Sequence, residues 1–211
     1  MIELFTSAFL TLLVIIDPPG CAPIFASLTS GASVADRRRM AIRSCVIAWC
    51  ILVFFALFGE WLLGHMGISL SAFRLAGGIM LFMIALDMVF ERRTERREER
   101  AEEIKGTPEA EDVSVFPMAI PMIAGPGSIA SVMLLNAKAE GTQESLIVFG
   151  AMTLVILITM AALLAAGPLM RFVGAKVEAM ITRILGVILA ALATQFVLDG
   201  LERSLPGLAG A

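Results

Sequence analysis

The stretch IIDPPGCAPIF, residues 15–25, places an acidic residue and three prolines inside an otherwise apolar segment. Asp17 is costly to place in lipid, Pro18 and Pro19 cannot donate helical hydrogen bonds, and Gly20 weakens a helix further. A helix broken in lipid exposes backbone N–H and C=O groups that no water satisfies, so such breaks persist only beside a cavity or within protein. The stretch therefore predicts a broken membrane helix that borders a cavity or is packed against other helices.

The composition of the whole chain is typical of a polytopic membrane protein. Its 211 residues are 58% hydrophobic and 17% charged, with a mean hydropathy of +0.89, whereas soluble domains hold about 45–50% apolar and about 25% charged residues. Most of the charge lies in two blocks, residues 36–43 and 91–112. The remaining runs are long enough to cross a bilayer, which takes about 20 apolar residues per helix. We therefore expect an all-α integral membrane protein.

Six membrane spans are predicted, and two of them are broken. The first is interrupted at residues 17–20 and the fourth at residues 121–127. The predicted spans are residues 3–28, 41–63, 68–90, 115–137, 145–170 and 178–200.

A charged segment divides the chain into two units of three spans each, residues 1–90 and 115–211. Residues 91–114 form a cytoplasmic linker that is too polar to bury a core. We expect its first part to continue the third helix until Gly106 and Pro108 end it. A solvated linker is the simpler interpretation, and a regulatory or partner-binding segment is the alternative.

The positive charges predict how the chain is oriented. The loops after the first, third and fifth spans hold twelve of the 16 Lys and Arg residues, whereas the opposite side has only Lys138 and Arg203. Because basic loops stay in the cytoplasm, both termini are expected on the other side. A five-span alternative, in which the first segment lies on the membrane surface, would put the termini on opposite sides.

The two units carry matching motifs at nearly equal offsets. Pro19-Gly20 corresponds to Pro126-Gly127 at an offset of 107 residues, and FRLAGGIML (73–81) corresponds to TRILGVILA (182–190) at an offset of 109. Because three spans are an odd number, the second unit must be inserted upside down relative to the first. We therefore predict two inverted three-helix repeats with broken first and fourth helices, an architecture of secondary transporters that bind substrate near mid-membrane.

The two restarting helices form the candidate substrate site. Their positive N-termini suit a carboxylate, and Asp17 suits an ammonium group, so a small zwitterion is the expected solute. Asp17 can also act only as the N-cap of the second half-helix, and capping and binding can coexist. The second unit has Ala124 at the corresponding position. The candidate substrate-binding residues are Asp17, Pro18, Pro19, Gly20, Gly125, Pro126, Gly127 and Ser128.

Three polar residues elsewhere are candidates for a structural or gating role. Arg74 and Arg183 correspond in the repeat, lie inside opposite membrane faces, and can extend outward to the interface. Asn136 lies near the end of the fourth span, where an interfacial position is expected.

Several other function classes are disfavoured. The chain has no GxxxxGK[ST] motif for ATP and no basic stripe for nucleic acid. Its three cysteines lack paired spacing and His65 is its only histidine, so we expect no metal and no cofactor. We expect no enzyme either, because Asp17 is central whereas Asp87 and Asp199 lie near opposite faces and cannot form a catalytic pair with it. The alternative to a transporter is a non-transporting membrane module, such as a lipid-handling or regulatory partner subunit.

At its two breaks the chain resembles the MarC family of bacterial inner-membrane proteins, a neutral amino acid transporter-like family. The resemblance covers essentially the whole chain. It implies a multi-pass protein of the bacterial inner membrane that moves neutral amino acids or related small solutes, and we add protons or sodium as the expected coupling ion. The solute, the direction of transport and any homo-oligomer stay open. The residues that carry the resemblance are Asp17-Pro18-Pro19-Gly20, Pro23, Pro121 and Gly125-Pro126-Gly127.

We predict that both ends of the chain lie outside the cytoplasm. Alkaline phosphatase, which folds only in an oxidising compartment, should be active when it is fused after Ala211. A fluorescent protein that matures only in the cytoplasm should stay dark at the same position. The reverse pattern would contradict the orientation derived from the basic loops.

Overall fold

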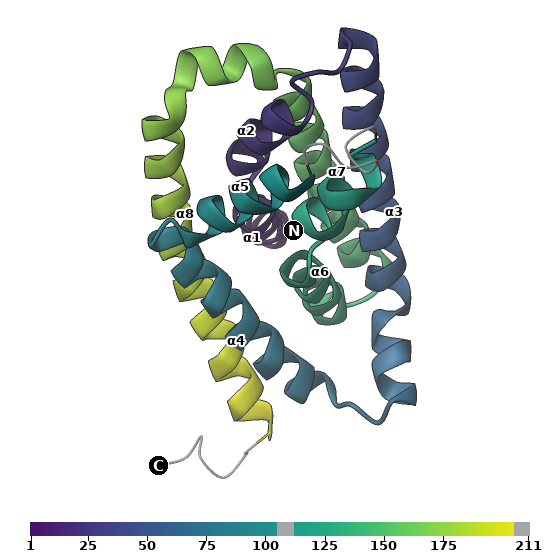
Figure 1. The fold of residues 1–211 in the computed structure, drawn as a ribbon. Helices are drawn as coiled ribbons and strands as arrows, with labels where there is room; N and C mark the ends of the chain where they lie inside the picture. Colours follow the sequence, from purple (N-terminus) through teal and green to yellow (C-terminus); the bar gives the residue numbers. More distant parts are fainter. Residues whose placement is uncertain (105–111, 205–211) are drawn as a thin grey trace.

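The computed structural model describes residues 1–104 and 112–204, and all regular structure in these ranges is helical (Figure 1). This confirms the predicted all-α fold. Five stretches are long and apolar enough to cross a membrane, and the bent pair η2 and α6 makes a sixth when it is counted as one span. The elements are α1 (Ile2–Ile16), α2 (Pro18–Leu28), α3 (Val34–His65), α4 (Leu70–Val89), α5 (Arg92–Ile104), η2 (Ser114–Ile123), α6 (Pro126–Lys138), α7 (Thr142–Leu164) and α8 (Ala166–Ser204).

Three helix boundaries differ from the prediction: the starts of α3 and α8 and the end of α7. α3 begins before residue 41, at Val34, because the Ser33 hydroxyl caps it by accepting the Asp36 N–H at 3.2 Å. α7 ends at Leu164 and not at residue 170. Pro168 cannot donate a hydrogen bond within a continuing helix but is tolerated in the first turn of a new one, so a new helix, α8, starts at Ala166.

The charged linker does not extend the third span, contrary to the sequence expectation. α4 ends at Val89, Glu91 adopts a left-handed φ of 61°, and α5 turns back against α2 and α4. Arg93, Arg97 and Ala101, spaced four residues apart, point inward on one face of α5, whereas its other described side chains are mostly exposed. The expected helix stop at residues 106–108 lies outside the described residues.

The first break is a single residue, Asp17, whose left-handed conformation (φ 57°, ψ 66°) separates α1 from α2. The second break is longer. Phe116 and Ile120 are extended because a residue that precedes proline avoids the helical region. η2 and α6 then meet at an angle of 55°.

The helices of the two halves make reciprocal contacts. α1 and α2 pack on α7, and η2 and α6 pack on α3; likewise α2 contacts α8, and α6 contacts α4. α4 and α8 lie side by side along one edge of the molecule, with α3 along the opposite edge and the broken helices between them (Figure 1). Exchanging the halves preserves these contacts, although α1 also contacts α8 and α6 also contacts α7 without an equally extensive equivalent in the described part of the other half. The inversion of the two repeats stays a prediction.

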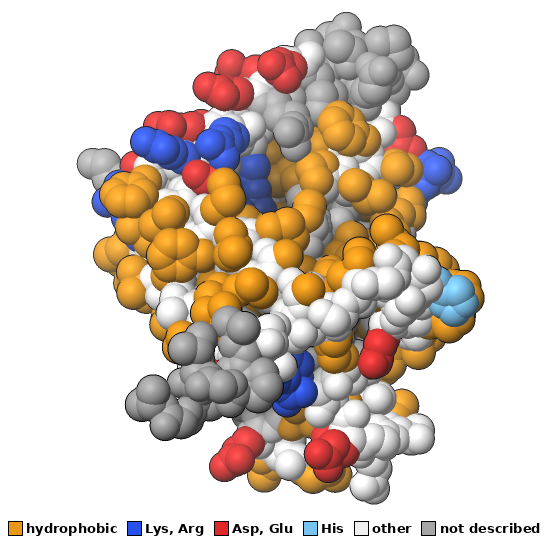
Figure 2. All heavy atoms as spheres, turned by 90° about the horizontal axis from the view of Figure 1, so that it is seen from below, with side chains coloured by type: hydrophobic (Ala, Val, Ile, Leu, Met, Phe, Trp, Pro, Cys, Tyr) orange, Lys and Arg blue, Asp and Glu red, His pale blue; other side chains and the backbone are white. Residues whose placement is uncertain are grey.

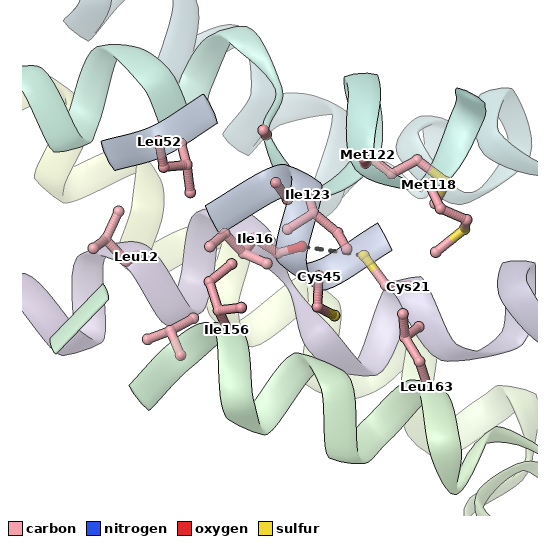
Figure 3. Packing of buried hydrophobic residues seen from close by; sticks show 14 of the residues in the cluster. Leu12, Ile16, Cys21, Cys45, Leu52, Met118, Met122, Ile123, Ile156 and Leu163 are labelled. Carbon is pink, nitrogen blue, oxygen red and sulfur yellow. Dashed lines mark hydrogen bonds between the residues drawn. The ribbon is translucent and has the colours of Figure 1, made fainter. Parts of the chain in front are cut away.

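The main core lies where the broken helices meet α3 and α7 (Figure 3). Leu12 and Ile16 from α1, Leu52 from α3 and Ile156 from α7 are buried there. By contrast, large hydrophobic side chains such as Phe54 are exposed on the outer faces of the long helices. In Figure 2 hydrophobic side chains cover the middle of the visible face, and charged ones gather toward its upper and lower margins. This distribution suits a protein surrounded by lipid.

The close packing of α4 on α8 predicts opposite effects for two Gly→Ala substitutions. In Gly78→Ala the added Cβ would lie 2.8 Å from Val197 Cγ2 and 2.9 Å from the Ala193 carbonyl oxygen. At Gly150 in α7 nothing lies within 4 Å, so Ala should stabilise the helix by up to about 1 kcal/mol. We expect Gly78→Ala to lower the melting temperature of the detergent-purified protein and Gly150→Ala to leave it equal or higher. Equal effects of the two substitutions on the melting temperature would contradict the close packing of α4 on α8.

Candidate binding site at the two helix breaks

Asp17 caps the helix that restarts after the first break. Its Oδ1 accepts the Gly20 N–H at 3.2 Å, and the side chain is only 1% exposed. Pro18 and Pro19 occupy the first two positions of α2, where their missing N–H groups cost nothing. The carboxylate is therefore the N-cap of α2, the role that the sequence alone already allowed.

The same carboxylate is paired with an arginine from the linker helix. Arg97 Nη1 lies 3.2 Å from Asp17 Oδ2, and the Arg97 side chain is 12% exposed. A Cβ on Gly20 would lie 2.2 Å from Asp17 Oδ2 and 3.0 Å from Arg97 Nη1. A larger residue at this position would therefore displace the Asp17–Arg97 pair.

Arg93, one turn earlier on α5, satisfies a backbone group that the break leaves free. The Ile15 carbonyl would accept a hydrogen bond from residue 19 in a continuous helix, but Pro19 has no N–H. Arg93 Nη2 donates to this carbonyl oxygen at 2.8 Å, and Nη1 lies 2.9 Å from Met88 Sδ. Burial, together with the nearby Arg97 charge, lowers the pKa of Arg93 to about 10, so the guanidinium stays protonated at neutral pH.

A cavity of about 170 Å³ lies at the second break. Its wall includes Gly125, Pro126, Gly127 and Ser128 at the start of α6, and the two arginines of α5. The N-cap of α6 is Gly125, so no side chain caps the first turn of this helix. A second cavity, of about 150 Å³, borders the same two arginines together with Asp87 and Arg96.

Ser128 contributes a free hydroxyl to the first cavity. The residue is 2% exposed and lines the cavity wall. Within the described residues its Oγ makes no hydrogen bond. An uncapped helix start, a free hydroxyl and two guanidinium groups therefore converge on one small space.

The structure separates the predicted site residues into two groups. Gly125, Pro126, Gly127 and Ser128 line the cavity. Asp17 is not in the cavity wall and reaches it only through Arg97. Pro18, Pro19 and Gly20 form the first turn of α2 and are likewise outside that wall.

Sequence reasoning missed Arg93 and Arg97, because the linker was interpreted as a solvated segment. One signal was available. Arg93, Arg97 and Ala101 recur every four residues, and alanine in an otherwise charged helix marks a face that packs against protein.

The three candidate structural or gating residues lie away from this cavity. Arg74 is 1% exposed and does not extend outward as expected; its Nε and Nη1 have no hydrogen-bond partner in the described part of the chain. Arg183 pairs with Glu91 at 2.5 Å. Asn136 Nδ2 donates to the Ala56 carbonyl oxygen at 2.8 Å and so links α6 to α3.

The Asp17–Arg97 pair predicts strong coupling between two substitutions. Removing one partner of a buried pair costs roughly 3–5 kcal/mol, because the other charge is left uncompensated. Arg97→Met should therefore destabilise the protein far more in the wild-type background than in Asp17→Asn, as measured by unfolding in detergent. Arg96→Met is the matched control, because Arg96 is 66% exposed and surface pairs contribute about 0–1 kcal/mol. Additive effects of Asp17→Asn and Arg97→Met would show that the pair is unimportant.

The chain is similar along its length to a described family of membrane proteins. Residues 2–205 match the family that is described as "MarC family integral membrane protein". The UPF0056 membrane protein MJ1677 of Methanocaldococcus jannaschii is 36% identical over 97% of this chain and 98% of its own length. The UPF0056 membrane protein YvbG of Bacillus subtilis is 32% identical over 99% of both chains.

A third relative, the UPF0056 inner membrane protein YhgN of Escherichia coli, is 31% identical over 95% of this chain and 98% of its own. No solved structure matches. The family match and these relatives confirm the resemblance carried by the two breaks. The chain belongs to the MarC family of integral membrane proteins.

Proposed function

We propose that this protein is a secondary transporter of a small polar solute, with neutral amino acids and related metabolites as the leading class. The observation that carries the proposal is the cavity of about 170 Å³ at the second helix break. Broken membrane helices with free backbone groups beside a cavity are the usual substrate sites of such transporters.

The size of the cavity limits the solute. At roughly 30 Å³ of liquid volume per water molecule, the space of about 170 Å³ equals the volume of some five or six water molecules. Drug-sized ligands occupy pockets of about 300–1,000 Å³. A small amino acid or a short organic acid fits the space as it stands.

The reciprocal contacts of the two halves support alternating access. Because α1 and α2 contact α7 as η2 and α6 contact α3, the halves can exchange conformations and open the site to one side and then to the other. We place the protein in the bacterial inner membrane, with both termini outside the cytoplasm. The relative named an inner membrane protein supports the first point, and the basic loops support the second.

We assign the site to solute binding and not to catalysis. For the transport step we propose protons or sodium as the coupling ion. The described cavity wall carries two arginines and a serine but no carboxylate or histidine that could act as a base. The cavity therefore offers groups that hold a solute and no acid–base pair that would transform it.

The proposal predicts saturable exchange of a small solute by the purified protein. Proteoliposomes loaded with unlabelled alanine, glycine or serine should accumulate the labelled form faster than protein-free liposomes. Ser128→Leu should abolish this exchange, because the larger side chain fills the cavity, whereas Ser131→Leu, outside the cavity wall, tests whether bulk on α6 alone is harmful. If folded wild-type protein exchanges no member of a broad panel of small solutes, the transport proposal fails.

A further inference from the structure

The two helix breaks differ in what caps the restarting helix. At α2 the Asp17 carboxylate accepts the Gly20 N–H. At α6 the N-cap is Gly125, which has no side chain to offer. Because the first N–H groups of a helix have no partner within the helix and carry partial positive charge, the start of α6 lacks the anion that the start of α2 already has.

The arginines around the cavity leave one positive charge unbalanced. Arg97 pairs with Asp17, and Arg96 pairs with Asp87. The two contacts of Arg93, in contrast, are a carbonyl oxygen and a thioether sulfur, both uncharged. Arg93 lines the cavity, so an anion bound there would meet a guanidinium without a carboxylate partner in the described residues.

Ser128 places an unpartnered hydroxyl in the wall of the cavity, which distinguishes it from the equally unpartnered Ser131. The Ser128 residue is 2% exposed and lines the cavity, and its Oγ has no hydrogen-bond partner among the described residues. Ser128 Oγ is not among the fully enclosed side-chain atoms that lack a partner, so a solute in the cavity can reach it. A bound solute with acceptor oxygens would satisfy it.

We propose that the cavity recognises its solute by a carboxylate, which occupies at α6 the place that the Asp17 carboxylate occupies at α2. The Gly127 and Ser128 N–H groups and Ser128 Oγ donate to it, and Arg93 supplies the balancing charge. This inference rests on the proposed function, because it assumes that the cavity is the solute site. It concerns binding of the solute and not its transport.

The same geometry gives Asp17 a different role from binding the ammonium group of the solute, which the sequence suggested. Its two oxygens are engaged by the Gly20 N–H and by Arg97 Nη1, so it is a positioning residue that holds Arg97 beside the cavity. The described cavity wall contains no acidic residue. An ammonium group on the solute therefore adds little to binding, and short carboxylic acids should bind as well as the corresponding amino acids.

The test is ligand-induced stabilisation of the full-length protein in detergent at constant ionic strength. The probes are propionate, L-lactate, L-alanine, propionamide and L-alaninamide, so that the carboxylate and the ammonium group vary separately. Inorganic phosphate and a short-chain phosphatidylglycerol are added to detect a phosphate or lipid-headgroup site. Ligands that bind only the folded protein raise its melting temperature according to concentration and Kd.

Three variants locate the effect. Ser128→Asp places a tethered carboxylate in the cavity at the start of α6, a position where acidic residues favour the helix, so the fold should persist while free carboxylates no longer bind. Ser128→Ala should weaken binding about tenfold or more, the equivalent of one hydrogen bond to a charged group. Ser131→Ala is the matched control, because its Oγ is also buried and unpartnered in the described part but lies outside the cavity wall.

We expect stabilisation by the three carboxylates, none by the two amides, loss in Ser128→Asp and no change in Ser131→Ala. Equal stabilisation by the amides, binding of phosphate or phosphatidylglycerol without carboxylates, or unchanged carboxylate binding in Ser128→Asp would each overturn the inference. Its outcome is separable from that of the transport assay. Carboxylate binding without exchange in proteoliposomes leaves this site standing and removes the transporter, whereas exchange of solutes that lack a carboxylate does the reverse.

Discussion

Two arginines of the charged linker make the first helix break possible. Pro18 and Pro19 have no N–H groups to donate to the last carbonyl oxygens of α1. Without other partners these oxygens would be unsatisfied in an apolar environment. Arg93 bonds the free Ile15 carbonyl oxygen, and Arg97 compensates the Asp17 carboxylate that caps α2. Removing both arginines would leave a buried acid and an open carbonyl together. The break and the linker helix therefore depend on each other.

This dependence brings the linker into the candidate site. α5 turns back at Glu91, and its inward face then reaches both the first break and the cavity beside the second. The halves of the chain thus share one cluster of positive charge although the breaks lie more than a hundred residues apart in sequence. A change at one break can therefore affect the other through the orientation of Arg97, and the proposed alternating access would need a coupling of this kind.

The fold and half of the candidate site could be predicted because they depend on local chemistry. Apolar length gives the spans, proline and glycine give the breaks, and Asp17 before two prolines gives a helix cap. The role of α5 could not be predicted, since its packing depends on where Glu91 turns the chain, and a helix with eleven charged or polar positions favours solvent when it is considered alone. Arg74 was misjudged for a related reason. Sequence alone places it within reach of the surface, whereas in the fold it is buried.

The most direct test of the whole account is the reactivity of a cysteine at position 128, in a background where Cys21, Cys45 and Cys50 are replaced by alanine. Two thiosulfonate reagents of similar size, one carrying a sulfonate and one a quaternary ammonium group, report both access and charge. If the cavity is open to a solute and Arg93 and Arg97 make it positive, the anionic reagent reacts faster, carboxylates slow it, and a cysteine at position 131 stays unreactive. Equal or faster reaction with the cationic reagent, or no reaction with either, would contradict a positively charged solute site at the helix breaks.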